Sequence, residues 1–217
     1  MTQTSAIHQP TQPSPGMKAP GRVDRAAAVR RALRRLVAEH GFHGASMSNV
    51  AKEAGVATGT AYVHYASKDE LVFATFLEAK RELGAAAMAN VDSEAPVHDR
   101  FVQIWLGIYR HLADEPERAR FLAQIDSSPY ASAAHEMAMR IDGDPIMAEA
   151  AALDAAAVLA PLPLEILYDL GLAPAVRLAA GIIYASGVLG TSESAELFDD
   201  DMLQQIAEAC WRAITRP

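Results

Sequence analysis

Residues 41–71 read GFHGASMSNVAKEAGVATGTAYVHYASKDEL, and this stretch decides the fold of the N-terminal part of the chain. Its pattern predicts one short helix over residues 47–54 and a second over residues 59–65. Gly55 lies between them and permits a sharp turn. Two short helices joined in this way form a helix-turn-helix over residues 46–65, a motif that binds double-stranded DNA.

The caps and the packing residues of this segment follow the same pattern. Ser46 and Thr58 are residue types that cap helix N-termini, and each stands directly before a predicted helix. Small or apolar residues occupy the positions where the two helices would pack against each other: Val50, Ala51, Ala54, Val56, Ala61 and Tyr65. By spacing alone, a helical hairpin with solvated polar residues fits equally well, because helix-turn-helix patterns are loose.

The remaining side chains of the segment are suited to DNA. Those on the second helix can form hydrogen bonds and none is acidic, so they can read base edges in the major groove. The free N–H groups at the start of the first helix suit a phosphate, and a lysine just beyond the second helix can contact another. The predicted DNA contacts are Ser46, Ser48, Thr58, Gly59, Thr60, Tyr62, His64, Tyr65 and Lys68.

Charge is distributed unevenly along the chain. Residues 1–70 contain nine Lys/Arg and five Asp/Glu, a net charge of +4, whereas residues 71–217 contain ten and 22, a net charge of −12. These sum to the overall charge of −8. A basic N-terminal part on an acidic body is expected when only one part contacts phosphates, although scattered surface charge could give the same asymmetry.

The composition favours an all-α protein. Of the 217 residues, 51% are hydrophobic but only 6% are aromatic, and alanine is abundant. Alanine is the best helix former and a poor strand former. No uncharged apolar run is long enough to span a membrane, no secretory signal is evident, and a single cysteine, Cys210, excludes an intramolecular disulfide. We therefore expect a cytoplasmic protein.

The rest of the chain predicts further helices. Residues 1–21 are rich in proline, glutamine, threonine and serine, which predicts a flexible arm. A helix over residues 130–160 is expected to be interrupted at Gly143-Asp144-Pro145. The other expected helices cover residues 24–40, 67–90, 97–113, 116–126, 164–170, 175–189 and 199–215. Ser67 and Glu70 are spaced as a capping box at the start of the 67–90 helix.

The segment around the predicted motif resembles the N-terminal domain of TetR family regulators over about residues 24–76. The family pattern is met by Gly41-Phe42, Ser46, Val50-Ala51, Ala54-Gly55-Val56, Gly59-Thr60, Tyr62, His64-Tyr65, Ser67-Lys68 and Leu71. Two positions depart from it, because the family usually has Leu or Ile at Ala61 and Phe at Tyr65. Both are packing positions, so a slight tilt of the second helix is expected without loss of a DNA-facing group.

The resemblance implies an all-helical homodimer of about nine helices per subunit. Residues 22–76 would be the DNA-binding domain, and residues 77–217 the regulatory and dimerisation domain. The last two helices of each subunit would pair in an intersubunit bundle, through Ile182, Ile183, Ser186, Met202, Ile206 and Trp211. A stripe of this kind could equally be the core of one subunit.

The resemblance also implies a repressor that binds a palindromic operator and is released by a small, largely apolar ligand. An activator, or control by a protein partner, remains open. The candidate pocket residues, for any of which core packing is the alternative, are Trp105, Tyr109, Leu112, Phe121, Ile125, Tyr130, His135, Met139 and Tyr168. The sequence contains no Cys/His pair with the spacing of a zinc site and no catalytic motif, so no metal, cofactor or enzymatic activity is expected.

Overall fold

The computed structural model describes residues 22–181 and 198–216, and the regular elements in these ranges are all helices. The first three make up the N-terminal part: α1 (Arg22–Gly44), α2 (Met47–Glu53) and α3 (Thr58–His64). Eight more follow: α4 (Lys68–Met88), α5 (Val97–Ala113), α6 (Pro116–Asp126), α7 (Ala131–Ala138), α8 (Pro145–Ala155), α9 (Leu164–Gly171), α10 (Ala173–Ala179) and α11 (Asp200–Ile214). None of the described helices is long and apolar enough to cross a membrane.

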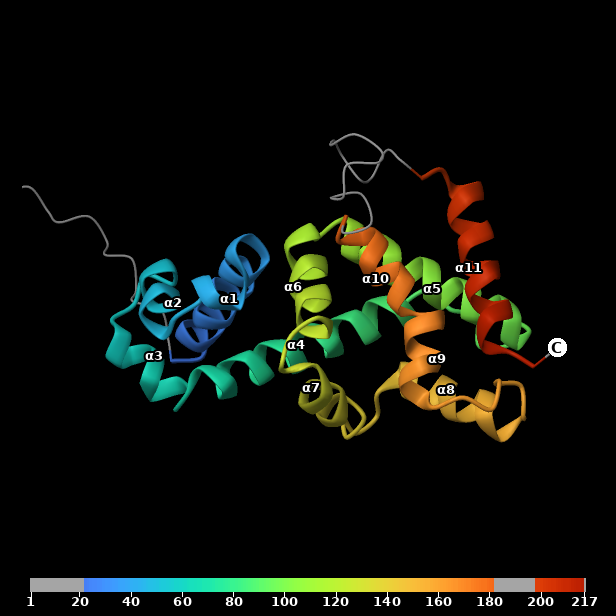
Figure 1. Cartoon of the computed structure of the whole chain (residues 1–217), viewed down its shortest axis with the longest axis horizontal. Helices are drawn as coiled ribbons and strands as arrows, with labels where there is room; N and C mark the ends of the chain where they lie inside the picture. The colour runs from blue at the N-terminus through green and yellow to red at the C-terminus, as the bar shows by residue number, and fades with distance from the viewer. Residues whose placement is uncertain (1–21, 182–197, 217) are drawn as a thin grey trace, which may run out of the picture.

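The long helix α4 connects the two ends of the molecule (Figure 1). It packs against α1 at one end and against α5, α6, α7 and α8 along the rest of its length. The predicted Ser67 cap is confirmed, whereas Glu70 bonds the N–H of the preceding residue, Ala66, and not that of Ser67 as in a standard capping box. Ser67 Oγ accepts a hydrogen bond from the Glu70 N–H at 3.1 Å, and the Glu70 carboxylate accepts one from the Ala66 N–H at 2.6 Å. These bonds fix where α3 ends and α4 begins.

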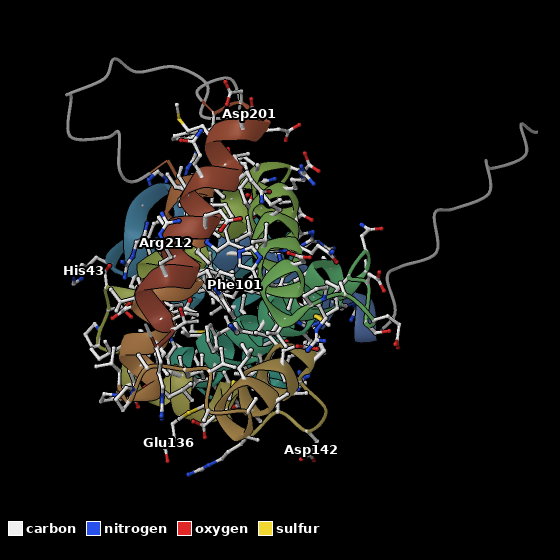
Figure 2. The ribbon with its side chains drawn as sticks, turned by 90° about the vertical axis from the view of Figure 1, so that its right-hand side faces the viewer. His43, Phe101, Glu136, Asp142, Asp201 and Arg212 are labelled. Atoms are coloured by element: carbon white, nitrogen blue, oxygen red, sulfur yellow. The ribbon has the colours of Figure 1, made fainter. Side chains whose placement is uncertain are left out.

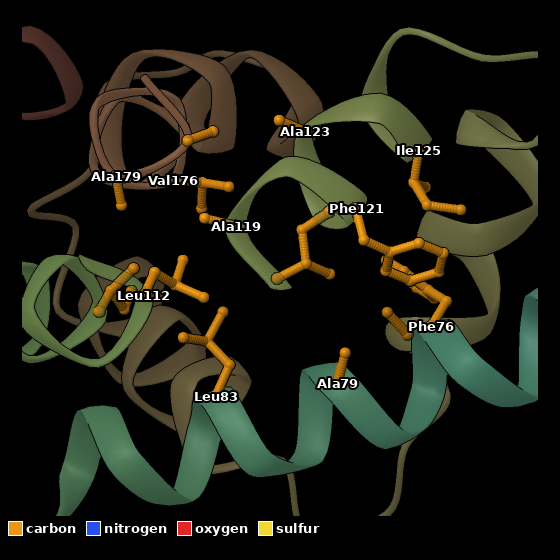
Figure 3. Close-up of a cluster of buried hydrophobic side chains, with 14 of the residues drawn as sticks. Phe76, Ala79, Leu83, Leu112, Ala119, Phe121, Ala123, Ile125, Val176 and Ala179 are labelled. Atoms are coloured by element: carbon orange, nitrogen blue, oxygen red, sulfur yellow. The ribbon is translucent and has the colours of Figure 1, made fainter. Parts of the chain in front are cut away.

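The main core lies between α4, α5, α6 and α10 (Figure 3). Phe76, Ala79 and Leu83 of α4 point into it, and Phe121 of α6 is completely buried there. Helices α4 and α5 approach closely at Gly107, where an added Cβ would lie 2.8 Å from the Ala87 carbonyl oxygen. A larger residue at this crossing would push the two helices apart.

Helix α1 joins the N-terminal part to the body. It packs along α6, and its direction changes at Gly41, whose φ of 68° and ψ of 179° are accessible almost only to glycine. The Arg30 guanidinium pairs with the Glu78 carboxylate on α4 at 2.5 Å, and this hydrogen bond raises the pKa of Arg30. The orientation of α1 is therefore fixed from both α4 and α6.

The expected interruption at Gly143-Asp144-Pro145 is confirmed. Gly143 has φ of 71°, and Asp144 caps α8 by accepting from the N–H groups of Ile146 and Met147 at 2.9 and 3.1 Å. The helix expected over 175–189 differs: α10 begins at Ala173 and ends at Ala179, with Ala180 as its C-cap and Gly181 at φ of 69°. Residues 182–189 lie outside the described ranges, as does the arm over 1–21. After α8, residues Leu159 and Thr215 form an isolated antiparallel bridge that ties this segment to the end of α11.

Candidate nucleic-acid interface and pocket

The turn between α2 and α3 is built as its sequence predicts. Ser46 caps α2, with its Oγ accepting from the Asn49 N–H at 3.1 Å. Gly55 has φ of 67°, the left-handed conformation expected for a glycine that follows a helix. The start of α3 differs from the prediction, because Ala57 is its N-cap and Thr58 is its first residue. The Thr58 side chain does not cap the helix and is exposed.

The inward face of α3 is packed tightly against α2. Ala51 and Ala61 are completely buried, so small side chains allow the close crossing that the pattern predicts. Tyr65 does not fit its predicted place among the DNA contacts. Its ring is only 6% exposed, and its hydroxyl accepts from Arg30 at 2.6 Å and donates to the Ala26 carbonyl oxygen at 3.3 Å. Tyr65 is therefore a packing residue, as its position in the motif also predicts, and it is not exposed for DNA because it turns toward α1.

The outward face of α3 carries the other predicted contacts. Tyr62 is 51% exposed and Thr58 and Gly59 are exposed, whereas Thr60 and His64 are half-buried. Ser46 and Ser48 are exposed at the start of α2. An added Cβ at Gly59 would meet nothing within 4 Å, so packing within the chain does not require a glycine there.

Sequence reasoning missed one residue of this face, Val63, which is 69% exposed. Its position beside Tyr62 was the available signal, since neighbouring residues on a short helix share its outer half when Ala61 and Tyr65 face inward. An apolar side chain among polar ones can contact a thymine methyl group.

Unpaired cations surround this face. In the described part of the chain, Arg30, Arg34 and Arg35 pair with Glu78, Glu117 and Glu53, respectively. No ion pair involves the following basic residues of the N-terminal part among those described: Arg25, Arg31, Lys52 and Lys68. Arg25 and Arg31 border a shallow hollow beside the turn, together with Gly55 and Thr60. Cations held near a helix-turn-helix without acidic partners can contact phosphates.

Lys68 occupies a different position from the other three. Its ammonium group donates a hydrogen bond to the Phe42 carbonyl oxygen at the end of α1, and its side chain is half-buried. It therefore links α1 to the start of α4, in addition to any contact with a phosphate.

A pocket lies in the C-terminal part, between α4, α5, α7, α8 and α9, with a volume of about 150 Å³. Of the nine predicted pocket residues, three line it: His135, Met139 and Tyr168. Most of its wall is apolar and was not predicted: Val97, Phe101, Ile104, Ala138, Ile146, Met147, Ala150, Leu153, Leu159, Leu164, Leu167, Leu172 and Ile214.

Five predicted pocket residues belong to the core instead. All are buried among α4, α5, α6 and their neighbours, in the packing that Figure 3 shows in part: Trp105, Tyr109, Leu112, Phe121 and Ile125. The Trp105 indole N–H donates to the Gly171 carbonyl oxygen at 3.1 Å. The prediction was wrong for these residues because an apolar helix face has the same spacing whether it meets a cavity or a neighbouring helix.

Tyr130 is also outside the pocket. Its ring lies 5.0 Å from that of Phe42 and 5.7 Å from that of Phe73, between centroids. Its hydroxyl donates to the Asp69 carboxylate at 2.7 Å, and burial together with this bond raises the pKa of Tyr130 to about 12. Tyr130 thus joins the start of α7 to the N-terminal part.

Polar groups enter the pocket at one side. Lys80 of α4 lies over the ring of Tyr168, with its ammonium 5.6 Å from the ring centroid. His135 of α7 is bonded to the Asp126 carboxylate at 2.9 Å. Burial lowers the pKa of Lys80 and raises the pKa of Tyr168. Sequence reasoning missed Lys80, because a lysine on a long amphipathic helix is usually solvated.

The predicted interface residues fall into two groups. Ile182, Ile183 and Ser186 lie outside the described residues. On α11, Met202 is 45% exposed and Ile206 is half-buried. Trp211 packs inside the chain, with its ring 5.3 Å from that of Phe101 and 5.5 Å from that of His98. Figure 2 looks onto α11, which runs from Asp201 past Arg212 across the region of Phe101. Cys210 is buried on the same helix, and burial raises the pKa of its thiol.

Comparison with known proteins assigns both parts of the chain. The family model described as "Bacterial regulatory proteins, tetR family" matches residues 29–75. The model described as "Tetracyclin repressor-like, C-terminal domain" matches residues 96–215, more than half of the chain.

Two relatives found by sequence differ in how much they cover. An uncharacterized HTH-type transcriptional regulator of Haemophilus influenzae is 29% identical over 206 residues, which are 90% of this chain and 98% of the relative. A fatty acid metabolism regulator protein of Bacillus subtilis is 40% identical over 43 residues, only 20% of this chain and 22% of the relative. The second match is too short to carry a ligand class over.

Solved structures agree with this assignment. A TetR-family transcriptional regulator from Haemophilus influenzae has a TM-score of 0.68 at 27% identity, covering 89% of this chain and 98% of that one. One from Shewanella has a TM-score of 0.73 at 24% identity, covering 89% and 99%, which supports the fold alone. With the helix-turn-helix geometry and both family models in agreement, the chain belongs to the TetR family of DNA-binding transcriptional regulators.

Proposed function

We propose that this regulator is a homodimeric repressor that binds a pseudo-palindromic operator through α3 and is released by a small, largely apolar ligand. The observation that carries the DNA-binding part is the outward face of α3, which is polar, free of acids and flanked by cations without acidic partners among the described residues. In this proposal the domains divide within α4, near residue 76, with the arm over 1–21 preceding them. The protein would act in the cytoplasm.

Binding would place α3 in the major groove. Tyr62 and Val63 are the most exposed large side chains of α3 and would contact base edges. The N–H groups at the start of α2, with Ser46 and Ser48, would contact a phosphate. The cations Arg25, Arg31 and Lys52 would contact others.

A two-fold dimer would present two copies of α3 to successive grooves. The two copies of α3 in such a dimer would lie about 34 Å apart, which is one turn of DNA. Because the dimer is two-fold symmetric, its binding site would be pseudo-palindromic. The exposed Met202 and the half-buried Ile206 on α11 support a contact between subunits there. Trp211 is assigned to packing within the subunit instead.

Ligand control requires a path from the pocket to α3. Helix α4 carries Lys80 in the pocket wall and begins directly after α3. Helix α7 carries His135 in the same wall, its C-cap Met139 lies there too, and Tyr130 before the helix contacts Phe42 and Asp69. A ligand that prefers one arrangement of α4 and α7 would shift α3, by no more than its differential affinity allows.

A protein partner is the alternative controlling agent. The pocket retains a volume of about 150 Å³ and has a mainly apolar wall, which favours a small molecule. A pocket filled by side chains would have favoured the partner.

The proposal is tested by selecting binding sites from random duplexes and measuring affinity against salt. We expect a short palindrome and a steep loss of affinity as salt rises. Changing Arg25, Arg31 or Lys52 singly to Gln should reduce the salt slope by about 1. Arg140→Gln is the control, because Arg140 is an exposed cation of the C-terminal part that follows α7 and pairs with Glu136. Equal affinity for all duplexes would exclude the operator, and sedimentation as a monomer would exclude the dimer.

A further inference from the structure

The pocket contains a cation without a partner. Lys80 extends from α4 into a wall that is otherwise mainly hydrocarbon. Among the described residues its ammonium forms no hydrogen bond and no ion pair, and its contact is with the face of Tyr168. Helices α7 and α8, which lie below α4 in Figure 1, pack against it. Lys80 is half-buried, and an ammonium that is partly removed from water without an acidic partner is costly, so the site is suited to an incoming anion.

The carboxylates that influence Lys80 most are already bonded to other groups. Asp144 accepts from the N–H groups of Ile146 and Met147 at the start of α8. Asp126 accepts from His135 at 2.9 Å, with its other oxygen buried and without a partner. Both acids act on Lys80 from beyond ion-pair distance, and they partly oppose the lowering of its pKa by burial. Neither therefore neutralises Lys80 by direct contact.

Two more acids border the pocket, and neither neutralises Lys80. Glu149 accepts two hydrogen bonds from Arg100, at 3.2 and 3.0 Å. Glu165 is exposed in the first turn of α9. Asp144 and Glu149 are thus hydrogen-bonded to other groups and Glu165 is exposed, whereas the Lys80 ammonium has no such partner among the described residues.

We propose that the pocket binds a small amphipathic carboxylic acid, with its carboxylate on the Lys80 ammonium and its hydrocarbon part against Leu153, Leu159 and Leu167. This inference rests on the proposed role of the pocket as a ligand site and adds the chemical class of the ligand. The Tyr168 hydroxyl and the His135 ring lie in the same wall and can orient the carboxylate. The apolar remainder of the wall gives affinity in proportion to the hydrocarbon that it removes from water.

The volume limits the size of the acid. The pocket encloses about 150 Å³, comparable to a cavity of about 150 Å³ that takes up benzene. Hexanoate, octanoate and benzoate fit this size. Leu164, which is 37% exposed, lies in the wall toward solvent, so a much longer chain would extend out of the pocket and gain little.

The experiment titrates the full chain with octanoate, benzoate, octan-1-ol and octylamine by calorimetry, without DNA. We expect octanoate to bind at least about tenfold more tightly than octan-1-ol, and octylamine to bind more weakly than either. Lys80→Met keeps an unbranched apolar stem and should bring octanoate and octan-1-ol within about threefold. Lys80→Arg keeps the charge and should retain the preference for the acid.

The outcomes are distinct. Equal affinity of the native chain for octanoate and octan-1-ol overturns the inference, whether or not the variants fold. A preference for octylamine also overturns it and assigns the site to Asp144. A preference for octanoate that persists in folded Lys80→Met places the carboxylate elsewhere and overturns the role of Lys80.

Operator release is measured separately, so that the two proposals fail independently. If octanoate binds through Lys80 but leaves the operator complex intact, the carboxylic-acid site is supported and release from the operator by this ligand is excluded. If octan-1-ol and octanoate bind equally and both release the operator, ligand control stands and the acid site falls.

Discussion

The outward face of α3 and the pocket around Lys80 are built in opposite ways. The face of α3 comes from one short segment, and its side chains point to solvent. The pocket combines side chains from six helices, α4, α5, α7, α8, α9 and α11, and its lining residues are up to 134 positions apart in sequence, from Lys80 to Ile214. Substitutions on the outward face of α3 can therefore leave the fold intact, whereas substitutions in the packed C-terminal part first change the packing.

A substitution at Tyr62 is expected to reduce operator affinity strongly while leaving the stability of the fold almost unchanged. Tyr62→Ala should weaken operator binding by about 1–3 kcal/mol, roughly 5- to 150-fold, because an exposed base-reading side chain is lost. The temperature of thermal unfolding should be nearly unchanged, and the affinity for octanoate should be unchanged. Tyr62→Phe is the control that separates the hydroxyl from the ring. Unchanged operator affinity in Tyr62→Ala would mean that α3 does not read the DNA.

The body should show the reverse behaviour at Gly107. Gly107→Ala places a Cβ 2.8 Å from the Ala87 carbonyl oxygen and should lower the free energy of unfolding by about 1–3 kcal/mol. Denaturant unfolding measures this effect. Loss of operator affinity should follow only to the extent that the protein unfolds. A variant as stable as the native chain would contradict the close crossing of α4 and α5.

Gly59→Ala is the matched substitution on the surface. No atom lies within 4 Å of the added Cβ, and alanine favours a helix over glycine, so stability should rise by about 0.5–1 kcal/mol. Operator affinity should fall by about 1 kcal/mol if the α3 backbone approaches DNA there. The comparison of Gly59→Ala with Gly107→Ala uses one chemical change at both sites. If Gly59→Ala and Gly107→Ala changed the stability equally, the outward face of α3 would not differ from the packed C-terminal part in its tolerance of substitution.

The smallest effect is expected for the pH dependence of stability, at the contact of His98 on α5 with Glu208 on α11. His98 bonds Asp99 and Glu208, each at 2.8 Å, and these bonds raise the pKa of His98. Because its pKa is raised in the folded state, its stabilisation is fully present below the unfolded pKa of about 6.5 and is lost as pH rises through the folded pKa.

His98→Gln should therefore destabilise the chain more at about pH 5.5 than at about pH 8.5. The difference should be below about 1 kcal/mol, since His98 and its partners are partly exposed and screened. Unfolding at the two pH values measures it. A larger effect at the higher pH would show that these bonds do not stabilise the protonated ring.

Local features were predictable because their causes lie within a few residues. The cap at Ser46, the turn at Gly55 and the cap at Ser67 each depend on backbone groups at most four positions away. The break at Gly143-Asp144-Pro145 was predictable for the same reason. Thr58 was misplaced by one position, which is the usual uncertainty of a helix end.

The pocket was not predictable from the same patterns. Trp105, Phe121 and Ile125 have the apolar spacing of pocket residues but fill the core. Lys80 has the sequence setting of a surface lysine but lines the pocket. Helical periodicity states which side of a helix is apolar and not what that side meets.

The sequence by itself determined the helices, the helix-turn-helix and the family, because these depend on short-range caps, turns and spacing. The tertiary structure alone decided that the Tyr65 hydroxyl bonds Arg30, that Tyr130 joins α7 to the N-terminal part, and that the pocket opens beside Lys80. The reason is physical. Packing between distant segments selects which of several equivalent apolar faces is filled, and it leaves a cavity where the filling is incomplete.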